Sequence, residues 1–173
     1  MYNRTFVWYN GCMMVTKILS NDELMEGTGL SKEELSEVFK REGKIRIRIE
    51  ETLYNFYPVV GEVRAGKPLY IDGKIYEWRG VPDTRGDFWF RVKGDSMIGS
   101  GIFPGDYLLV DRKLDPKSGD IVVASVDGEL TVKRYRIVTG RAYLVPENRK
   151  YEWIKMDKNT VIVGVVVHLS RDM

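Results

Sequence analysis

The chain has 173 residues, of which 43% are hydrophobic and 30% charged, and its net charge is +2. This composition is ordinary for a globular protein with a buried core, and it excludes a disordered chain. The longest apolar run, residues 161–167, is far shorter than the roughly 20 residues of a membrane helix. The opening residues lack the pattern of a secretory signal, so we expect a cytoplasmic protein without a membrane partner.

Cys12 is the only cysteine and His168 the only histidine. An internal disulfide is therefore excluded. One cysteine and one histidine do not form the cluster of ligands that a zinc site needs, so we expect no metal ion and no cofactor. A thiol-protease pair of these two residues is an alternative, but no motif surrounds either of them. A buried thiol and a histidine at the end of an apolar strand is the simpler interpretation.

Two helix-start signals stand close together, because segments 20–23 and 31–34 both read Ser-x-x-Glu, the pattern of a capping box. Gly27 and Gly43 follow the two predicted helices, where a left-handed residue ends a helix most easily. No helix is evident in residues 1–19. The pattern predicts two short helices joined by a tight turn.

After the second helix, cations alternate with isoleucines in residues 44–49, which predicts a strand with its cations on one face. A second strand over residues 53–57 could pair with it. Residues 1–57 thus resemble a small winged helix-turn-helix domain, with α+β structure. Its candidate contacts to double-stranded operator DNA are Lys32, Lys40, Lys44, Arg46 and Arg48.

The second predicted helix also carries Glu33, Glu34 and Glu37, which DNA phosphates repel. Residues 1–57 contain eight Lys or Arg and nine Asp or Glu, a net charge of −1. A small helical cap on the second domain therefore remains an alternative to a DNA-binding domain.

Residues 58–173 form a series of short apolar or alternating segments separated by turn residues, which predicts a mostly antiparallel sheet or a small barrel. Asp72-Gly73 and Asp127-Gly128 are expected to be hairpin turns. The predicted strands cover residues 59–63, 74–78, 88–93, 107–111, 120–126, 129–136, 142–145 and 161–169.

Ser96 follows a predicted strand and a Gly-Asp turn, which can hold its hydroxyl in a fixed, projecting position while nearby backbone amides face a developing oxyanion. Because a serine hydroxyl is a poor nucleophile near neutrality, it needs a base. A lysine serves as one only if burial lowers its pKa. Lys133, within a predicted strand, is a candidate, although an exposed lysine on an edge strand is the simpler interpretation of its position.

The segments FRVKGDSMIGSGIFPGDYLLV, GDIVVASVDGELTVKRY and LVPEN resemble the catalytic domain of the LexA and UmuD family of serine–lysine autopeptidases. The resemblance spans residues 58–169 and implies a β-fold shared with signal peptidase. It implies that Ser96 is the nucleophile and that Lys133, 37 residues later, is its base. Residues 58–68 resemble the self-cleavage segment, which implies cleavage between Ala65 and Gly66.

Small side chains at the cleaved bond would let an extended backbone enter a narrow cleft, with Val63 anchored in an apolar pocket. The resemblance implies a homodimeric repressor that cleaves itself in the DNA-damage (SOS) response, when a RecA filament acts as co-protease. Alternatives are a UmuD-like accessory subunit of an error-prone polymerase, a self-cleaving regulator that does not bind DNA, a signal peptidase, and a non-catalytic dimerisation module. The 65 residues before the bond favour the repressor over the accessory subunit.

Overall fold

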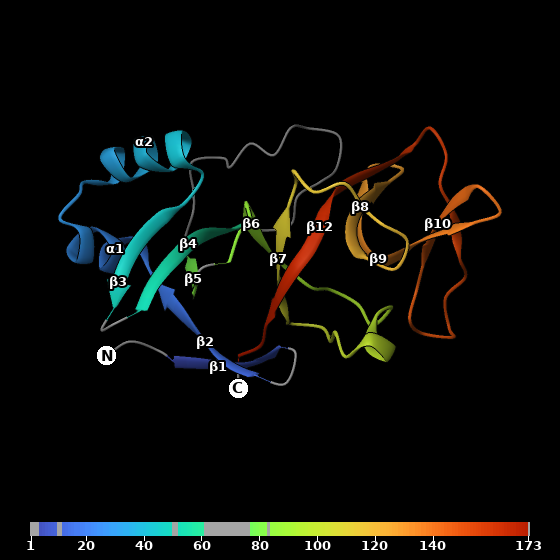
Figure 1. The fold of residues 1–173 in the computed structure, drawn as a ribbon, viewed down its shortest axis with the longest axis horizontal. Helices are drawn as coiled ribbons and strands as arrows, with labels where there is room; N and C mark the ends of the chain where they lie inside the picture. Colours follow the sequence, from blue (N-terminus) through green and yellow to red (C-terminus); the bar gives the residue numbers. More distant parts are fainter. Residues whose placement is uncertain (1–3, 10–11, 50–51, 61–76, 83, 173) are drawn as a thin grey trace.

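The computed structural model describes residues 4–9, 12–49, 52–60, 77–82 and 84–172. Within these ranges the chain forms two α-helices, one 3₁₀ turn and twelve strands (Figure 1). The helices are α1 (Asn21–Thr28) and α2 (Lys32–Glu42), and the 3₁₀ turn is Ile98–Ser100. The strands are β1 (Arg4–Tyr9), β2 (Cys12–Leu19), β3 (Ile45–Ile49), β4 (Thr52–Val60), β5 (Trp78–Pro82), β6 (Phe88–Arg91), β7 (Tyr107–Asp111), β8 (Ile121–Val126), β9 (Glu129–Val138), β10 (Arg141–Val145), β11 (Ile154–Lys155) and β12 (Thr160–Ser170).

Both helices begin at the capping boxes read from the sequence, with Ser20 and Ser31 as the N-caps. The end of the first helix was predicted wrongly. Gly27 lies inside α1, and Gly29 is the left-handed C-cap, with φ of 71° and its amide bonded to the Met25 carbonyl.

The first two strands were not expected from the sequence. β1 and β2 form an antiparallel hairpin whose register runs from Arg4↔Lys17 to Tyr9↔Cys12. The sequence between them is Asn-Gly, the strongest short-range signal for a two-residue hairpin connection. The dipeptide therefore predicts the hairpin that the structure shows.

β5 lies between β2 and β4 in the sheet, whose order is β1-β2-β5-β4-β6-β7-β12-β8-β9-β10-β11, with β3 paired to β4. Trp78 of β5 is buried beneath the helices, where its ring meets Phe39 edge-on at 5.3 Å between centroids. The core under the helices therefore includes a strand that follows residues 61–76 in the sequence. The expected boundary at 57/58 falls within β4, and the division into two domains stays a prediction.

The C-terminal strands follow the predicted segments closely, and all of their pairings are antiparallel; the pairing of β4 with β6 is parallel. Asp127 and Gly128 both have positive φ, 49° and 91°, as a two-residue hairpin turn requires. Asp72-Gly73 lies outside the described residues. The expected fold class is confirmed: a mostly β C-terminal part with a small N-terminal part that contains both helices. Neither described helix has the length and apolar composition needed to cross a membrane.

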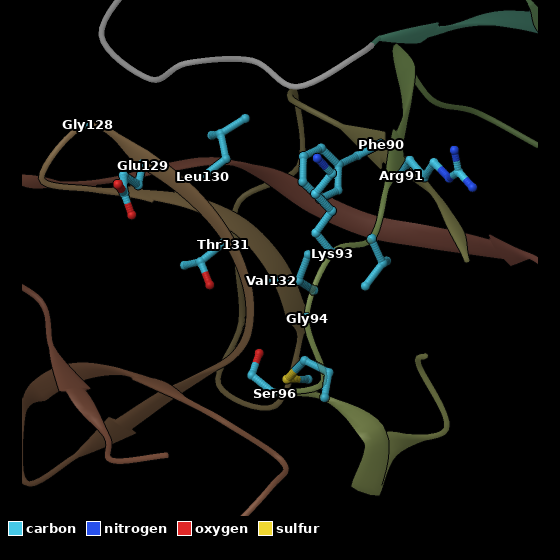
Figure 2. Close-up of a pocket in the computed structure, with 12 residues that line it drawn as sticks. Phe90, Arg91, Lys93, Gly94, Ser96, Gly128, Glu129, Leu130, Thr131 and Val132 are labelled. Carbon is cyan, nitrogen blue, oxygen red and sulfur yellow. The ribbon is translucent and has the colours of Figure 1, made fainter. Parts of the chain in front are cut away.

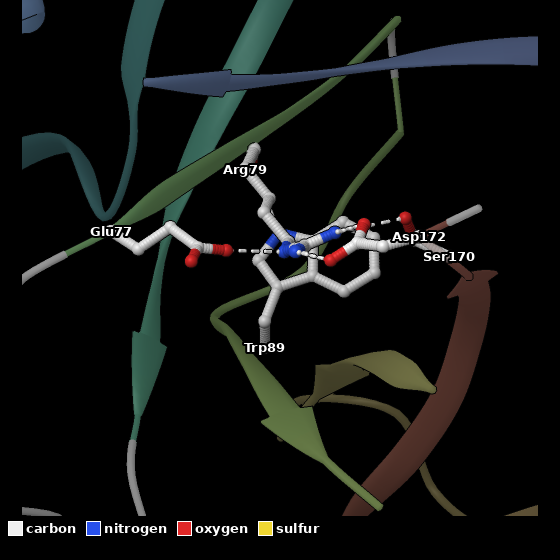
Figure 3. A network of polar contacts seen from close by, with 5 residues as sticks. All are labelled: Glu77, Arg79, Trp89, Ser170 and Asp172. Carbon is white, nitrogen blue, oxygen red and sulfur yellow. Dashed lines mark hydrogen bonds and ion pairs between the residues drawn. The ribbon is translucent and has the colours of Figure 1, made fainter. Parts of the chain in front are cut away.

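A buried arginine joins β5 to the end of the chain (Figure 3). Arg79 is 1% exposed, and its two terminal nitrogens donate to Asp172 at 2.8 and 2.7 Å. Its Nε donates to Glu77 at 2.6 Å, and a further bond reaches Ser170 at 3.3 Å. Trp89 of β6 donates its indole N–H to the Arg79 carbonyl at 3.0 Å. The network therefore connects β5, β6 and the segment that follows β12.

Candidate active site

Ser96 lies in the turn between β6 and the 3₁₀ helix. Gly94, two residues earlier, has φ of 76°, which favours glycine and directs the chain away from β6. Met97 is 2% exposed and packs in the core cluster with Phe90 and Val92. Burial of the next side chain anchors the turn and leaves Ser96 itself half-buried.

Lys133 reaches Ser96 from β9. Its side chain is 6% exposed, and Nζ lies 2.8 Å from Ser96 Oγ. The other neighbours of Nζ are Thr131 Oγ1 at 2.5 Å and the Val132 carbonyl at 3.0 Å. An ammonium group would donate one hydrogen bond to each of the three oxygens. A neutral amine would donate two and turn its lone pair toward the third.

Burial lowers the pKa of Lys133 to about 8, because removal of water disfavours the charged form. No carboxylate among the described residues forms an ion pair with this lysine. A substantial neutral fraction is therefore present at mildly alkaline pH, which an exposed lysine would not have.

A cavity of about 270 Å³ opens beside Ser96 (Figure 2). Figure 2 shows the hydroxyl groups of Ser96 and Thr131 facing each other across the space between the Ser96 turn and β9. Residues 129–134 of β9 pair with β8, whereas β10 pairs only with residues 134–138. The second edge of residues 129–133 thus has no strand partner among the described residues, and an extended peptide could pair there. The lining residues are Phe90, Arg91, Val92, Lys93, Gly94, Ser96, Met97, Gly128, Glu129, Leu130, Thr131 and Val132.

The loop after β10 fixes the Ser96 turn in place. The Glu147 amide donates to the Ser96 carbonyl at 2.8 Å, and the Glu147 carbonyl accepts from the Gly99 amide at 2.7 Å. A Cβ at residue 99 would collide with that carbonyl, so only glycine allows this approach. The Glu147 carboxylate is bonded to Arg134, which also donates to Ser100 at 2.9 Å. Arg134 follows Lys133 on β9, so the turn and the lysine are held by one network.

Asp95, directly before Ser96, is held by the same loop. The Asn148 amide nitrogen donates to the Asp95 carbonyl at 3.0 Å and to its carboxylate at 3.2 Å. The Tyr151 hydroxyl donates to the other carboxylate oxygen and holds the pKa of Asp95 below its usual range. Asp95 therefore stays ionised and its backbone position is fixed.

Of the residues predicted for the cleavage segment and for the alternative thiol-protease pair, the structure describes only the side chain of His168. Val63, Ala65 and Gly66 lie outside the described residues, as does the side chain of Cys12. His168 is 2% exposed, and its ring packs edge-on against Trp89 at 5.8 Å. Burial lowers its pKa to about 4, so it is neutral near pH 7.

The predicted DNA contacts lie on α2 and β3. Lys32 and Lys40 are exposed, and Lys40 forms an ion pair of 2.8 Å with a glutamate one turn earlier on α2. Lys44 is half-exposed before β3, and Arg46 is exposed on it. Arg48 belongs to β3, but its side chain lies outside the described residues. The role of these residues stays a prediction.

Sequence reasoning missed the residues that support Ser96 and Lys133. Strand alternation in the sequence does place Thr131, two positions before Lys133, on the same face of the strand, but it does not identify Thr131 as a hydrogen-bond partner of the lysine. Glu147 and Asn148 stand in the LVPEN segment, but their contacts with the Ser96 turn join chain segments about 50 residues apart and have no local signal.

Comparison with known proteins adds a family match over residues 58–167, to the Peptidase S24-like family. The chain is 40% identical over 120 residues to the LexA repressor of Carboxydothermus hydrogenoformans, which covers 66% of this chain and 59% of that protein. The LexA repressor of Caldicellulosiruptor saccharolyticus is 42% identical over 120 residues, covering 67% and 59%. That of a Shewanella species is 36% identical over 137 residues, covering 74% and 66%. The aligned part thus spans 59% of the length of the first two relatives.

Proposed function

Because the chain belongs to the Peptidase S24-like family, we propose that it is a self-cleaving serine peptidase in which Ser96 and Lys133 cut the Ala65–Gly66 bond. The observation that carries this proposal is the contact of 2.8 Å between Lys133 Nζ and Ser96 Oγ, made by a lysine whose pKa burial lowers to about 8. A neutral amine next to a serine hydroxyl is the arrangement that serine–lysine catalysis requires.

In the proposed reaction, Lys133 takes the hydroxyl proton of Ser96 as Oγ bonds to the carbonyl carbon of Ala65. The amides of Ser96 and Met97 form no hydrogen bond with the described residues, so they remain available as donors to the oxyanion. The Lys133 ammonium then gives its proton to the leaving nitrogen of Gly66, and the peptide bond breaks. Water, deprotonated by Lys133, hydrolyses the resulting ester and restores the Ser96 hydroxyl.

The unpaired edge of residues 129–133 supports the way in which the cleaved segment is proposed to bind. An extended backbone pairing there would lie along the cavity next to Ser96. Small side chains at Ala65 and Gly66 would let the extended backbone lie close to Ser96. The Val63 side chain would pack against the apolar residues that line the cavity.

Mass spectrometry after incubation at mildly alkaline pH tests the proposal. We expect two products, residues 1–65 and residues 66–173, with a half-life that does not change on dilution because the substrate is tethered. Ser96→Ala and Lys133→Ala should both remain uncut, whereas Lys113→Ala, at an exposed lysine after β7, should be cut normally. A cut at another bond, or a half-life that lengthens with dilution, would contradict this assignment.

We further propose that the intact chain is a homodimeric LexA-like repressor that binds double-stranded operator DNA and is cleaved in the DNA-damage response with a RecA filament as co-protease. The relatives that carry the name LexA repressor support this role. The proposed DNA contacts are Lys32, Lys40, Lys44, Arg46 and Arg48, in a part of the chain that precedes the family match.

Charge reversal at Arg46 and Arg48 tests the repressor role. Because both are proposed to contact phosphates, the double variant should bind all duplex sequences more weakly and with a flatter salt dependence. Lys113→Glu, at an exposed lysine outside this region, is the control. If the intact chain binds no duplex at low salt, a self-cleaving regulator that does not bind DNA replaces the repressor.

A further inference from the structure

The segment 134–158, which contains the second half of β9 and all of β10 and β11, concentrates positive charge. It has seven Lys or Arg and three Asp or Glu, a net charge of +4, in a chain whose total is +2. Its strands lie at the end of the molecule opposite to α1 and α2 (Figure 1). This charge is therefore distinct from that of the predicted DNA contacts on α2 and β3.

Strand register places part of this charge on one face of the sheet. Tyr143 of β10 is directly opposite Arg136 of β9 on one side and Lys155 of β11 on the other. The neighbouring residues Leu144 and Ile154 point the other way, into a core cluster. Arg136, Tyr143 and Lys155 thus form a row across the outer face, which spans about 10 Å because adjacent strands are about 5 Å apart. We call this surface the β9–β11 face, and it also includes Arg141 and Trp153.

The cations of the β9–β11 face have no carboxylate partner in the part of the chain that the structure describes. Arg136, Arg141 and Lys155 are exposed, and none of them forms an ion pair with a described residue. Of the three carboxylates in the segment, Glu147 is bonded to Arg134 and Asp157 accepts from the Asn159 amide at 2.9 Å. The third, Glu152, is exposed next to Trp153.

One aromatic ring of this face, that of Trp153, is exposed, and the ring of Tyr143 beside it is half-buried. Trp153 is 57% exposed, the second-highest value among the large hydrophobic side chains that the structure describes. Its ring meets Tyr143 edge-on at 6.0 Å between centroids, with an angle of 63° between the planes. The contact orients the indole without covering it, so one of its faces is open to a planar ligand.

We propose that the β9–β11 face binds single-stranded DNA, with a base stacked on Trp153 and phosphates on Arg136, Arg141 and Lys155. Exposed aromatic rings flanked by unpaired cations on a sheet are the features that bind single strands. Duplex DNA would use the cations but not Trp153, because its bases are already stacked on one another. An acidic peptide has no bases to stack, and it would also leave the indole unused.

Fluorescence anisotropy with a labelled oligothymidylate of about 20 nucleotides tests this surface in the uncut Ser96→Ala chain. Arg136→Glu with Lys155→Glu should weaken binding at least tenfold at about 50 mM salt, and should reduce the slope of log K against log salt by roughly 1.4. The control, Arg85→Glu with Lys113→Glu, makes the same charge change at exposed residues outside this face and should leave binding within about twofold.

Trp153 separates stacking from simple charge attraction. Trp153→Ala should weaken binding about fivefold or more, whereas Trp153→Phe should retain affinity and lose the quenching of tryptophan fluorescence that the oligonucleotide causes. Unchanged affinity after reversal of Arg136 and Lys155, or equal binding of a polyglutamate peptide, would overturn the proposal. Loss of all binding on reversal of Arg46 and Arg48 alone would do the same. The test does not depend on self-cleavage or on operator binding, so those proposals can fail separately.

Discussion

The Lys133 amino group has three oxygen neighbours within hydrogen-bonding distance, but no carboxylate among the described residues compensates for its loss of water. Its burial therefore costs stability whenever the group is charged. The same burial produces the neutral amine that the proposed reaction needs. The burial of Lys133 therefore favours catalysis and lowers the free energy of unfolding. Both the cleavage rate and the free energy of unfolding should depend on pH through the protonation of this residue.

The rate of self-cleavage should follow the ionisation of Lys133. Only the neutral amine can accept the Ser96 proton, so the rate should rise with pH, reach half its maximum near pH 8 and then level off. Lys133→Arg should be inactive at every pH, because a guanidinium stays charged. Initial rates from gel electrophoresis over a pH series measure this. A flat profile, or an active Lys133→Arg variant, would remove Lys133 from the mechanism.

Replacement of Lys133 by methionine should stabilise the chain at pH 7. The folded-state pKa of about 8 lies below the unfolded value near 10.4, so at pH 7 the folded chain bears the full penalty of a buried charge. We expect Lys133→Met to gain roughly 2 kcal/mol in free energy of unfolding. The gain should shrink between about pH 8 and pH 10, where the folded state loses its proton first.

Urea titrations of Ser96→Ala with and without Lys133→Met provide the measurement, since both proteins remain uncut. A gain that is the same at pH 7 and pH 10 would show that it comes from packing and not from the charge.

The local sequence made Ser96 and Lys133 candidates only, as a serine in a predicted turn and a lysine in a predicted strand, and it was the resemblance to the autopeptidase family that implied their roles. The local sequence could not name Asp95 and Tyr151 as partners, because their contact joins residues 56 positions apart. Nor could spacing alone give the depth of burial that lowers the pKa of Lys133. That depth depends on how β9 packs against the Ser96 turn, which only the assembled sheet determines.

At the scale of elements, local signals predicted the helix starts and most of the C-terminal strands. Side-chain capping and strand alternation act within a few residues, and so they are visible in the sequence. The position of β5 was not predictable in this way. Only part of its sequence was assigned to a strand, and its neighbours in the sheet, β2 and β4, are set by contacts across the whole N-terminal part.

The Arg79 network should contribute measurably to the stability of β5. Asp172→Ala leaves a buried guanidinium with Glu77 as its remaining carboxylate partner among the described residues, and removal of one partner of a buried pair is strongly destabilising. Since Asp172 is half exposed, we expect a loss of roughly 2 kcal/mol, below the full range for buried pairs. Urea midpoints in the Ser96→Ala background measure it.

Asp115→Ala provides the control, because this aspartate is exposed in the loop after β7 and should give no measurable change. Equal midpoints for the Asp172 and Asp115 variants would show that the C-terminal segment does not secure β5.

At the scale of the whole molecule, the proposed cleavage bond lies in the sequence between strands that pair with one another in one sheet. β1 to β4 precede the bond, whereas β5 follows it and pairs with β2 through Lys17↔Gly80 and with β4 through Phe56↔Gly80. β4 also pairs with β6. Both products would therefore contribute strands to one continuous sheet.

We expect the cleaved protein to elute from gel filtration at the volume of the intact chain. The two products should separate only when urea disrupts the strand pairing. Separation in plain buffer immediately after cleavage would show that these pairings do not hold the products together. The uncut Ser96→Ala chain, treated in the same way, gives the reference volume.

The insertion of β5 between β2 and β4 also changes what a cut would mean for the cell. Before the cut the sheet is unimolecular, and its integrity does not depend on concentration. After the cut the same strands form a complex of two chains, which falls apart once the concentration drops below its dissociation constant. Cleavage would then be necessary but not sufficient to separate the two products. The response would begin only when dilution or proteolysis removes one of them.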